Sequence, residues 1–208
     1  LRDRPAGAVP LFNISTAFVK GGIAMAADMK AKISQSLTHL LQHKDLDKIT
    51  VKELVADCAI SRQTFYYHFR DIMDVVEWQQ KQLLDQSIAR SLATPSFREA
   101  LQCMVQEAFQ HRQLIQQLMA SQRRGEIEQL FYKAVHTYLG KIFQDRAPFL
   151  ALTPTDADTI LRFSSWGVAG MMLTDLNRKQ PNPDALAQQM YSLLTGRLAV
   201  YIPDPSQP

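Results

Sequence analysis

One stretch of about twenty residues, Thr50 to Phe69, constrains the fold of this chain more than any other. It begins with a capping box, in which Thr50 precedes an apolar helix and Glu53 follows three residues later. A second helix cap, Ser61, comes only eight residues after Glu53. Two helices this close together must be short and must turn sharply at Cys58-Ala59-Ile60. The stretch therefore predicts a helix-turn-helix.

The second helix of this motif divides into two faces at about 100° per residue. Phe65 and Phe69 fall on one face, where they are expected to pack on Leu54 and the preceding helix. The opposite face carries Arg62, Gln63, Tyr66 and Tyr67. Arginine pairs with guanine, glutamine with adenine, and a tyrosine hydroxyl with a phosphate, so this face suits DNA. Thr64 lies on the flank, and His68 lies nearer the core, where a structural role and a phosphate contact are both open.

The run from Cys58 to Phe69 resembles the DNA-binding domain of TetR-family transcriptional regulators. The family pattern is a capped helix, a small-residue turn and then Ser-x-x-Thr-(Phe/Leu)-Tyr-x-His-Phe, and the likeness covers roughly residues 28–78. The resemblance implies a homodimer that binds a palindromic operator in double-stranded DNA. It also implies DNA contacts at Lys52, Arg62, Gln63, Thr64, Tyr66, Tyr67 and His68, with Thr50 near a phosphate.

Two positions depart from the family pattern. The turn residue, usually glycine, is Ala59, and an alanine in the left-handed conformation costs on the order of 1 kcal/mol. Where the family often has Asn-Lys after the His-Phe pair, this chain has Asp71-Ile72. The phosphate contact of that lysine is therefore in doubt, and Asp71 is expected to cap the next helix.

The run from Arg62 to Phe69, with its continuation from Val75 to Trp78, looks similar to one branch of the family, which includes regulators of dihydroxyacetone kinase operons. In that branch a kinase-like protein, rather than a free small molecule, can be the effector partner. The resemblance thus leaves an unknown small-molecule effector and a protein effector both open.

Composition and charge narrow the class of protein. The 208 residues are 46% hydrophobic and 21% charged, which is typical of globular proteins, and no run of eighteen apolar residues predicts a membrane helix. Cys58 and Cys103 are far apart, so we expect no disulfide framework and a cytoplasmic protein. From Met25 to Val75, seven Lys and Arg balance seven Asp and Glu. DNA binding must therefore depend on a few placed cations rather than on a broad basic field.

The remaining periodicity predicts an all-α protein. Residues 1–24 are expected to form a leader or flexible arm and residues 25–70 a three-helix helix-turn-helix domain, whose first helix starts at an Asp28 N-cap. Residues 71–208 are expected to form a helical bundle for effector response and dimerisation. Within the bundle we expect helices at about 71–93, 96–109, 111–119, 125–144, 155–177 and 183–201. No β-hairpin signal appears.

The last two helices predict a dimer interface. Glycine inside a helix costs up to about 1 kcal/mol relative to alanine, so Gly167 and Gly170 indicate the close approach of another helix. Paired with their copies about a two-fold axis, the two helices would form a four-helix interface. The expected interface residues are Trp166, Gly167, Gly170, Met171, Met190 and Leu194. Packing of the same residues within one protomer is the alternative.

A ligand pocket in the bundle is a further prediction, because a pocket needs a few polar groups among apolar walls. The candidate residues are Cys103, Met104, Phe109, Tyr132, His136 and Trp166, and ordinary core packing is the alternative. There is no Gly-rich phosphate loop, HExxH motif or paired carboxylate–histidine run, so we predict no catalytic residue and no cofactor. His39 and His43 lack an evident third ligand, and no metal site is predicted.

The sequence therefore favours a DNA-binding transcriptional regulator. We expect a homodimeric repressor, and we expect an effector to change its binding to the operator. The alternative is an activator or an interaction module controlled by a protein partner. Whether the purified protein binds DNA alone distinguishes the two.

Overall fold

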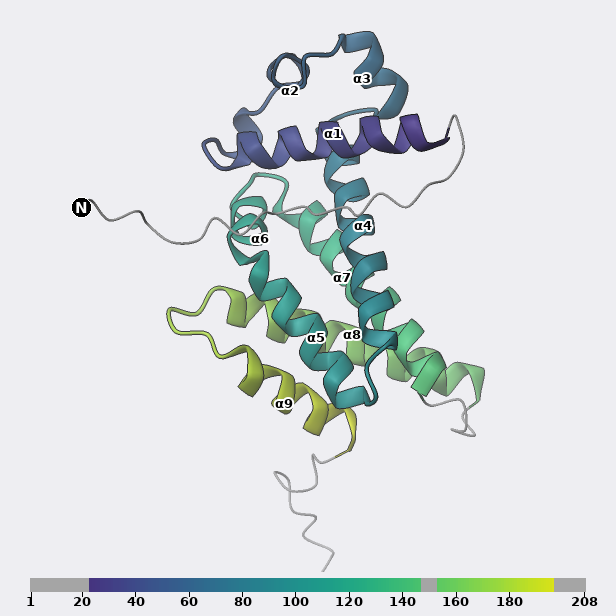
Figure 1. The fold of residues 1–208 in the computed structure, drawn as a ribbon. Coiled ribbons are helices and arrows are strands. Elements are labelled where there is room, and N and C mark those ends of the chain that lie inside the picture. Colours follow the sequence, from purple (N-terminus) through teal and green to yellow (C-terminus); the bar gives the residue numbers. More distant parts are fainter. Residues whose placement is uncertain (1–22, 147–152, 197–208) are drawn as a thin grey trace, which may run out of the picture.

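The computed structural model describes residues 23–146 and 153–196 of the chain (Figure 1). Over these residues every regular element is a helix, which confirms the all-α prediction. The elements are α1 (Ile23–Leu41), the 3-10 helix η1 (Leu46–Lys48), α2 (Val51–Asp57), α3 (Arg62–His68), α4 (Ile72–Leu92), α5 (Phe97–Gln110), α6 (Arg112–Met119), α7 (Arg124–Arg146), α8 (Pro154–Leu176) and α9 (Pro183–Leu194).

The first helix differs from the prediction. It begins at Ile23, so Asp28 lies inside α1 and is not an N-cap. Ala24, Ala26 and Ala27 are strong helix formers, which extends the helix upstream of the polar residue that looked like its start. Of the predicted arm, residues 1–22 lie outside the described residues, and the last two residues belong to α1.

The other caps form where the sequence predicts them. The Thr50 side chain accepts from the Glu53 amide at 3.3 Å, and the Thr50 amide donates to Glu53 Oε2 at 3.1 Å, which completes the capping box. Ser61 and Asp71 likewise accept from the amides of Thr64 and Asp74, and Ser96 caps α5 by accepting from the Glu99 amide. These caps set where α2, α3, α4 and α5 begin.

Figure 1 shows α1, α2 and α3 gathered at one end of the molecule, with α4 running from them into the larger bundle. We call α1, η1, α2 and α3 the head. Its buried core continues into α4, and further into Met119 of α6 and Ile127 of α7. A second core lies between α5, α7, α8 and α9. Two hydrophobic cores thus meet along α4 and α7.

Polar contacts hold α4 at both ends. Near the head, the side-chain amide of Gln79 donates to Thr38 Oγ1 of α1 at 2.9 Å. At the far end, Arg146 Nη2 donates to the carbonyl oxygens of Ser91 and Leu92, each at 3.2 Å. The buried Tyr138 hydroxyl lies 2.6 Å from Ser91 Oγ, and burial raises the pKa of Tyr138 well above its usual range, so it stays a donor. The last carbonyl groups of α4 therefore receive hydrogen bonds from a side chain of α7.

Two expectations from composition can be compared with the described residues. Cys58 and Cys103 are both free thiols, as their separation predicted, and burial raises the pKa of the Cys58 thiol. Within residues 23–146 and 153–196, none of the helices has the length and apolar character needed to cross a lipid bilayer.

Candidate DNA-binding interface

The corner between α2 and α3 adopts a left-handed conformation at one residue. Ala59 has φ of 53°, and it is the one residue other than glycine with a positive φ in the described part of the chain. The chain reverses there because the Ile60 amide donates to the Val55 carbonyl at 3.0 Å, which satisfies the end of α2. The predicted strain at Ala59 is therefore present.

Ala59→Gly is expected to raise the free energy of unfolding by about 1 kcal/mol. The substitution removes a left-handed cost of about 1–2 kcal/mol, which the larger entropy of unfolded glycine partly offsets. Thermal and denaturant unfolding measure the change. Ala56→Gly is the matched control on the exposed interior of α2, where glycine is expected to cost about 1 kcal/mol instead. A loss of stability in both variants would contradict the assignment of strain to the corner.

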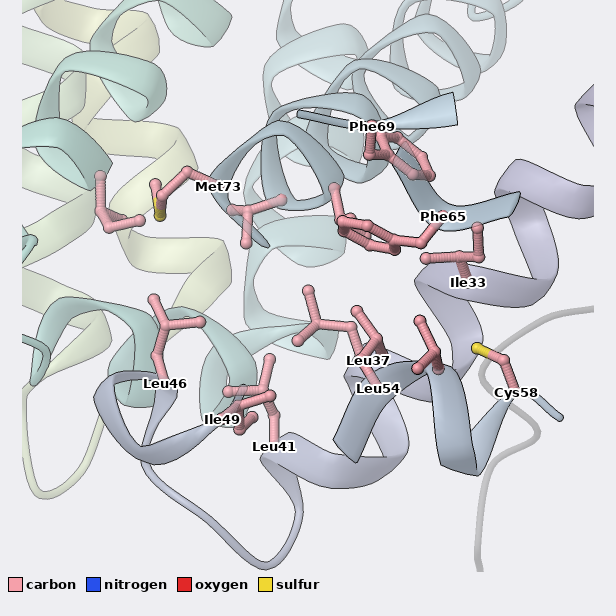
Figure 2. Packing of buried hydrophobic residues seen from close by; sticks show 14 of the residues in the cluster. Ile33, Leu37, Leu41, Leu46, Ile49, Leu54, Cys58, Phe65, Phe69 and Met73 are labelled. Carbon is pink, nitrogen blue, oxygen red and sulfur yellow. The ribbon is translucent and has the colours of Figure 1, made fainter. Parts of the chain in front are cut away.

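The inner face of α3 fixes how the helix is presented. Phe65 is fully buried and Phe69 nearly so, with ring centroids 6.1 Å apart. Figure 2 shows both rings directed into the same core as Ile33, Leu37 and Leu54. A helix of seven residues is marginal by itself, so this packing and the Ser61 cap hold α3 in place. The predicted inner face is confirmed.

The outer face of α3 carries large side chains in solvent. Tyr66 is 58% exposed and Tyr67 82% exposed, and Arg62 and Gln63 are exposed beside them. The four side chains therefore project from a helix that is held rigidly from behind. A short, rigid helix with polar and aromatic groups on its free face has the shape and chemistry of a major-groove reader.

Charge around the helix-turn-helix, Thr50 to Phe69, leaves both cations of this motif available. Ion pairs join Lys44 to Glu53, Lys48 to Asp45, and Arg70 to Asp74. Hydrogen bonds from Lys44 and then from Thr50 lower the pKa of the Glu53 carboxyl, which keeps that carboxylate ionised and engaged. Within the described residues, Lys52 and Arg62 form no ion pair, and both are exposed. The helix-turn-helix thus presents positive charge, although residues 25–75 are neutral overall.

The side chains of the remaining predicted contact residues also make contacts within the protein. The Thr64 hydroxyl lies 2.8 Å from Ser61 Oγ, and the Thr50 hydroxyl donates to Glu53 Oε2 at 3.0 Å. His68 is half-buried, with its ring edge-on to Tyr67 at 5.0 Å between centroids. None of the hydrogen bonds found among the described residues involves its imidazole, so a bond from His68 to local backbone is not seen.

The predicted pocket residues do not share one cavity. Tyr132 stacks on Trp166 with centroids 4.0 Å apart, and His136 Nδ1 lies 3.2 Å from Ser165 Oγ, so these residues join α7 to α8. Cys103 and Phe109 lie on α5 outside the lining of the cavity found here, and of the six only Met104 lines it. On α7, Phe131 and Val135 line the cavity, and each lies one position before a predicted residue, about 100° around the helix.

The cavity has a volume of about 170 Å³ and lies between α4, α5, α6 and α7, with Met172 of α8. Its walls are mainly leucine, isoleucine, valine, methionine and aromatic side chains. Its polar lining residues are Gln79, Gln80, Ser87, Glu107, His111 and Tyr138. In the sequence, the apolar walls are visible only as leucines at helical spacing. That spacing is the same for residues that line a cavity and for residues that pack in a core.

One face of α8 is apolar and open. Phe163 is 76% exposed and Trp166 55% exposed, with Ile160 one turn earlier. A Cβ atom added to Gly167 or Gly170 would meet nothing within 4 Å. The two glycines therefore face outward, and packing within the protomer does not account for them.

The other predicted interface residues divide into two groups. Met171 and Leu194 are half-buried. Met190 is fully buried in the protomer's own core, which a partner cannot reach, so it does not belong to an exposed interface. Leu193, one helical position before Leu194, is the exposed apolar side chain of α9. The spacing of Ile160 and Phe163 with Gly167 would have indicated the open face of α8.

Comparison with known proteins adds evidence from outside the helix-turn-helix. Residues 96–196 match the TetR-type family model described as the transcriptional regulator C-terminal region, which spans α5 to α9. A comparison with curated proteins gives no match.

Two solved structures share the fold. The dihydroxyacetone kinase operon activator DhaS is 16% identical with a TM-score of 0.64, and the alignment covers 82% of this chain and 96% of that one. A TetR transcriptional regulator from Streptococcus agalactiae is 17% identical with a TM-score of 0.61, covering 83% of this chain and 96% of that one. The helix-turn-helix, the matching C-terminal region and the shared all-α fold agree: over residues 96–196 the chain is similar to TetR-type transcriptional regulators, and it has their fold.

Proposed function

We propose that this regulator is a homodimer that binds a palindromic operator and represses transcription until an effector alters its affinity for DNA. The exposed outer face of α3, braced from behind by Phe65 and Phe69, is the observation that carries the proposal. Residues 25–70 would form the DNA-binding domain and residues 71–208 the regulatory and dimerisation domain. Such a regulator acts by binding alone, and we assign it no catalytic residue.

In the proposed complex α3 enters the major groove. Arg62 and Gln63, at the first turn of α3, would contact base edges, because the N-terminal residues of a recognition helix lie deepest in the groove. Tyr66, Tyr67 and Lys52 would contact phosphates and set the register. Thr50, Thr64 and His68, whose side chains already serve caps or packing, would add backbone contacts at the edge of the interface.

The proposed dimer forms through the open face of α8, with Leu193 of α9 beside it. Ile160, Phe163 and Trp166 supply apolar area, and the outward-facing Gly167 and Gly170 let a partner helix approach closely. A two-fold axis through this face would present two copies of α3 to half-sites about one helical turn of DNA apart, roughly 34–36 Å.

A second candidate is transcriptional activation controlled by a protein partner. It is supported by the fold shared with DhaS, the dihydroxyacetone kinase operon activator. The two candidates make the same contacts with DNA and differ in the sign of the effect on transcription and in what the bundle binds.

Selection of DNA from a random pool by the purified protein tests the proposal. The expected result is an enriched palindrome with two equal half-sites, bound without any added protein. Transcription from a promoter carrying that palindrome then decides the sign: repression supports the leading candidate and activation the second. Failure to enrich any sequence would contradict sequence-specific binding by the chain alone.

A further inference from the structure

The link between α3 and α4 directs one cation to the outside of the head. Phe69, the residue after α3, has an extended backbone with φ of −143° and ψ of 144°. In extended backbone, successive side chains point to opposite sides. Phe69 is 2% exposed and points into the core (Figure 2). Arg70 is therefore directed away from that core, as Tyr66 and Tyr67 of α3 are, and its side chain is 83% exposed.

Asp74, in the first turn of α4, holds Arg70 by two contacts. The Arg70 amide donates to Asp74 Oδ2 at 2.9 Å, and Arg70 Nε donates to the same oxygen at 3.4 Å. Asp74 is itself fixed, because its amide donates to Asp71 Oδ1 at 2.9 Å in the cap of α4. The carboxylate therefore fixes both the backbone of Arg70 and the direction in which its guanidinium leaves the chain.

The outer edge of this guanidinium is open to a further anion. A guanidinium carries five N–H donors in a planar fork, and Asp74 receives only the one at Nε. Among the hydrogen bonds of the described residues, none comes from Nη1 or Nη2 of Arg70. Two N–H groups held side by side in this way match two oxygens of a phosphate.

The charges around Arg70 do not form a general positive field. Three carboxylates are close enough for their charges to act on the guanidinium, namely those of Asp74, Asp71 and Glu77. Lys30 of α1 is the second cation here, and its charge acts on Asp74. Three negative charges against two positive ones would not attract DNA by potential alone. A phosphate bound here would depend on the geometry of one arginine.

We propose that Arg70 binds one DNA phosphate in each operator half-site, beyond the C-terminal end of α3, and that Asp74 is the positioning residue for this contact. The inference rests on the proposed function and adds to it a residue outside the helix-turn-helix, Thr50 to Phe69. Lys52, in the first turn of α2, is the proposed phosphate contact near the start of this motif. Lys52 and Arg70 would together fix the register in which Arg62 meets the bases.

The salt dependence of operator binding tests the contact. Arg70→Ala is expected to weaken binding about tenfold and to lower the slope of log affinity against log salt by about one counterion per half-site. Arg70→Lys keeps the charge but loses the fork, so it should keep the slope and lose part of the affinity. Arg124→Ala is the matched control, because Arg124 is also exposed and pairs with an acid four residues later, Glu128, but belongs to α7. It should change neither quantity.

Two acid variants distinguish positioning from charge. Asp74→Ala and Glu77→Gln each remove one negative charge near Arg70, so an effect of charge alone would strengthen binding in both. If Asp74 positions Arg70, Asp74→Ala weakens binding instead, and Glu77→Gln does not. Combining Asp74→Ala with Arg70→Ala should then cost no more than Arg70→Ala alone, which a general loss of folding would not reproduce.

The outcomes that overturn the proposal are separable from failure of the proposed function. Unchanged affinity and slope in Arg70→Ala overturn the phosphate contact alone. Stronger binding by Asp74→Ala, or losses that simply add in the double variant, overturn the positioning role. Failure of the unmodified chain to bind any operator overturns the proposed function and this contact together.

Discussion

Gly170→Glu is expected to convert the dimer into monomers and to weaken operator binding by at least about 100-fold. The glycine faces open space in the protomer, so the glutamate is tolerated within one chain. In the proposed interface, however, two carboxylates would be placed against a partner helix, and burying an unpaired charge costs several kcal/mol. Light scattering reports the mass, and fluorescence anisotropy with operator DNA reports the affinity.

A glycine elsewhere in the chain provides the matched control. Gly125, in the first turn of α7, is also exposed with open space around it. Gly125→Glu makes the same chemical change far along the sequence from α8, and it should leave both mass and affinity unchanged. If Gly170→Glu still scatters as a dimer, the α8 interface is wrong.

Gly170→Ala tests the close approach of helices with less disturbance. Alanine in the interior of a helix favours the folded protomer by about 1 kcal/mol over glycine. If a partner backbone lies against Gly170, the added methyl group weakens the dimer instead. The expected result is weaker dimerisation by sedimentation, and a more stable dimer would show that no helix approaches there.

Arg62→Ala is expected to reduce operator affinity by about 1–3 kcal/mol and to relax the preference at one base pair in each half-site. Arg62 is exposed at the first turn of α3 and has no ion-pair partner among the described residues, so the loss is a loss of DNA contact rather than of folding. Selection of DNA by the variant measures the preference at every position of the operator.

Two lysine variants distinguish contacts with bases from electrostatic contacts with phosphates. Lys52→Ala is expected to weaken binding about equally for all sequences and to reduce the salt dependence by about one counterion. Lys141→Ala removes an exposed cation from α7 in the bundle and should change neither. If Arg62→Ala behaves like Lys52→Ala, with unchanged specificity, then Arg62 contacts phosphate and the assignment of base reading is wrong.

The parts of the head that the sequence predicted are those set by neighbours in the chain. The Thr50 capping box, the left-handed Ala59 and the inner position of Phe65 all depend on spacings of a few residues. The start of α1 was missed because Asp28 looked like a cap although the preceding residues favour helix. A polar residue can cap a helix, but the helix begins there only if the residues before it do not themselves favour helix.

The bundle was harder to predict because its features depend on packing between distant helices. Met190 and Leu193 occupy the same short helix, and only the position of α9 against α5 buries the first and exposes the second. The cavity follows from how α4 to α7 are spaced, and its wall residue Leu118 has the same apolar pattern as a filled core residue. Tyr132 was predicted to line a pocket because it is polar and aromatic, but it forms part of the contact between α7 and α8.

The unequal anchoring of α4 has a geometric consequence. Arg146 and the buried Tyr138 fix its far end, whereas its contact with α1 of the head has one side-chain hydrogen bond, from Gln79 to Thr38, beside apolar contacts. The helix has 21 residues, which corresponds to a length of about 31 Å. A rotation of about 6° about the anchored end would move the head by about 3.4 Å, which is one base-pair step. A lever of this length would turn a small change in side-chain packing beside α4 into the loss of register between two half-sites.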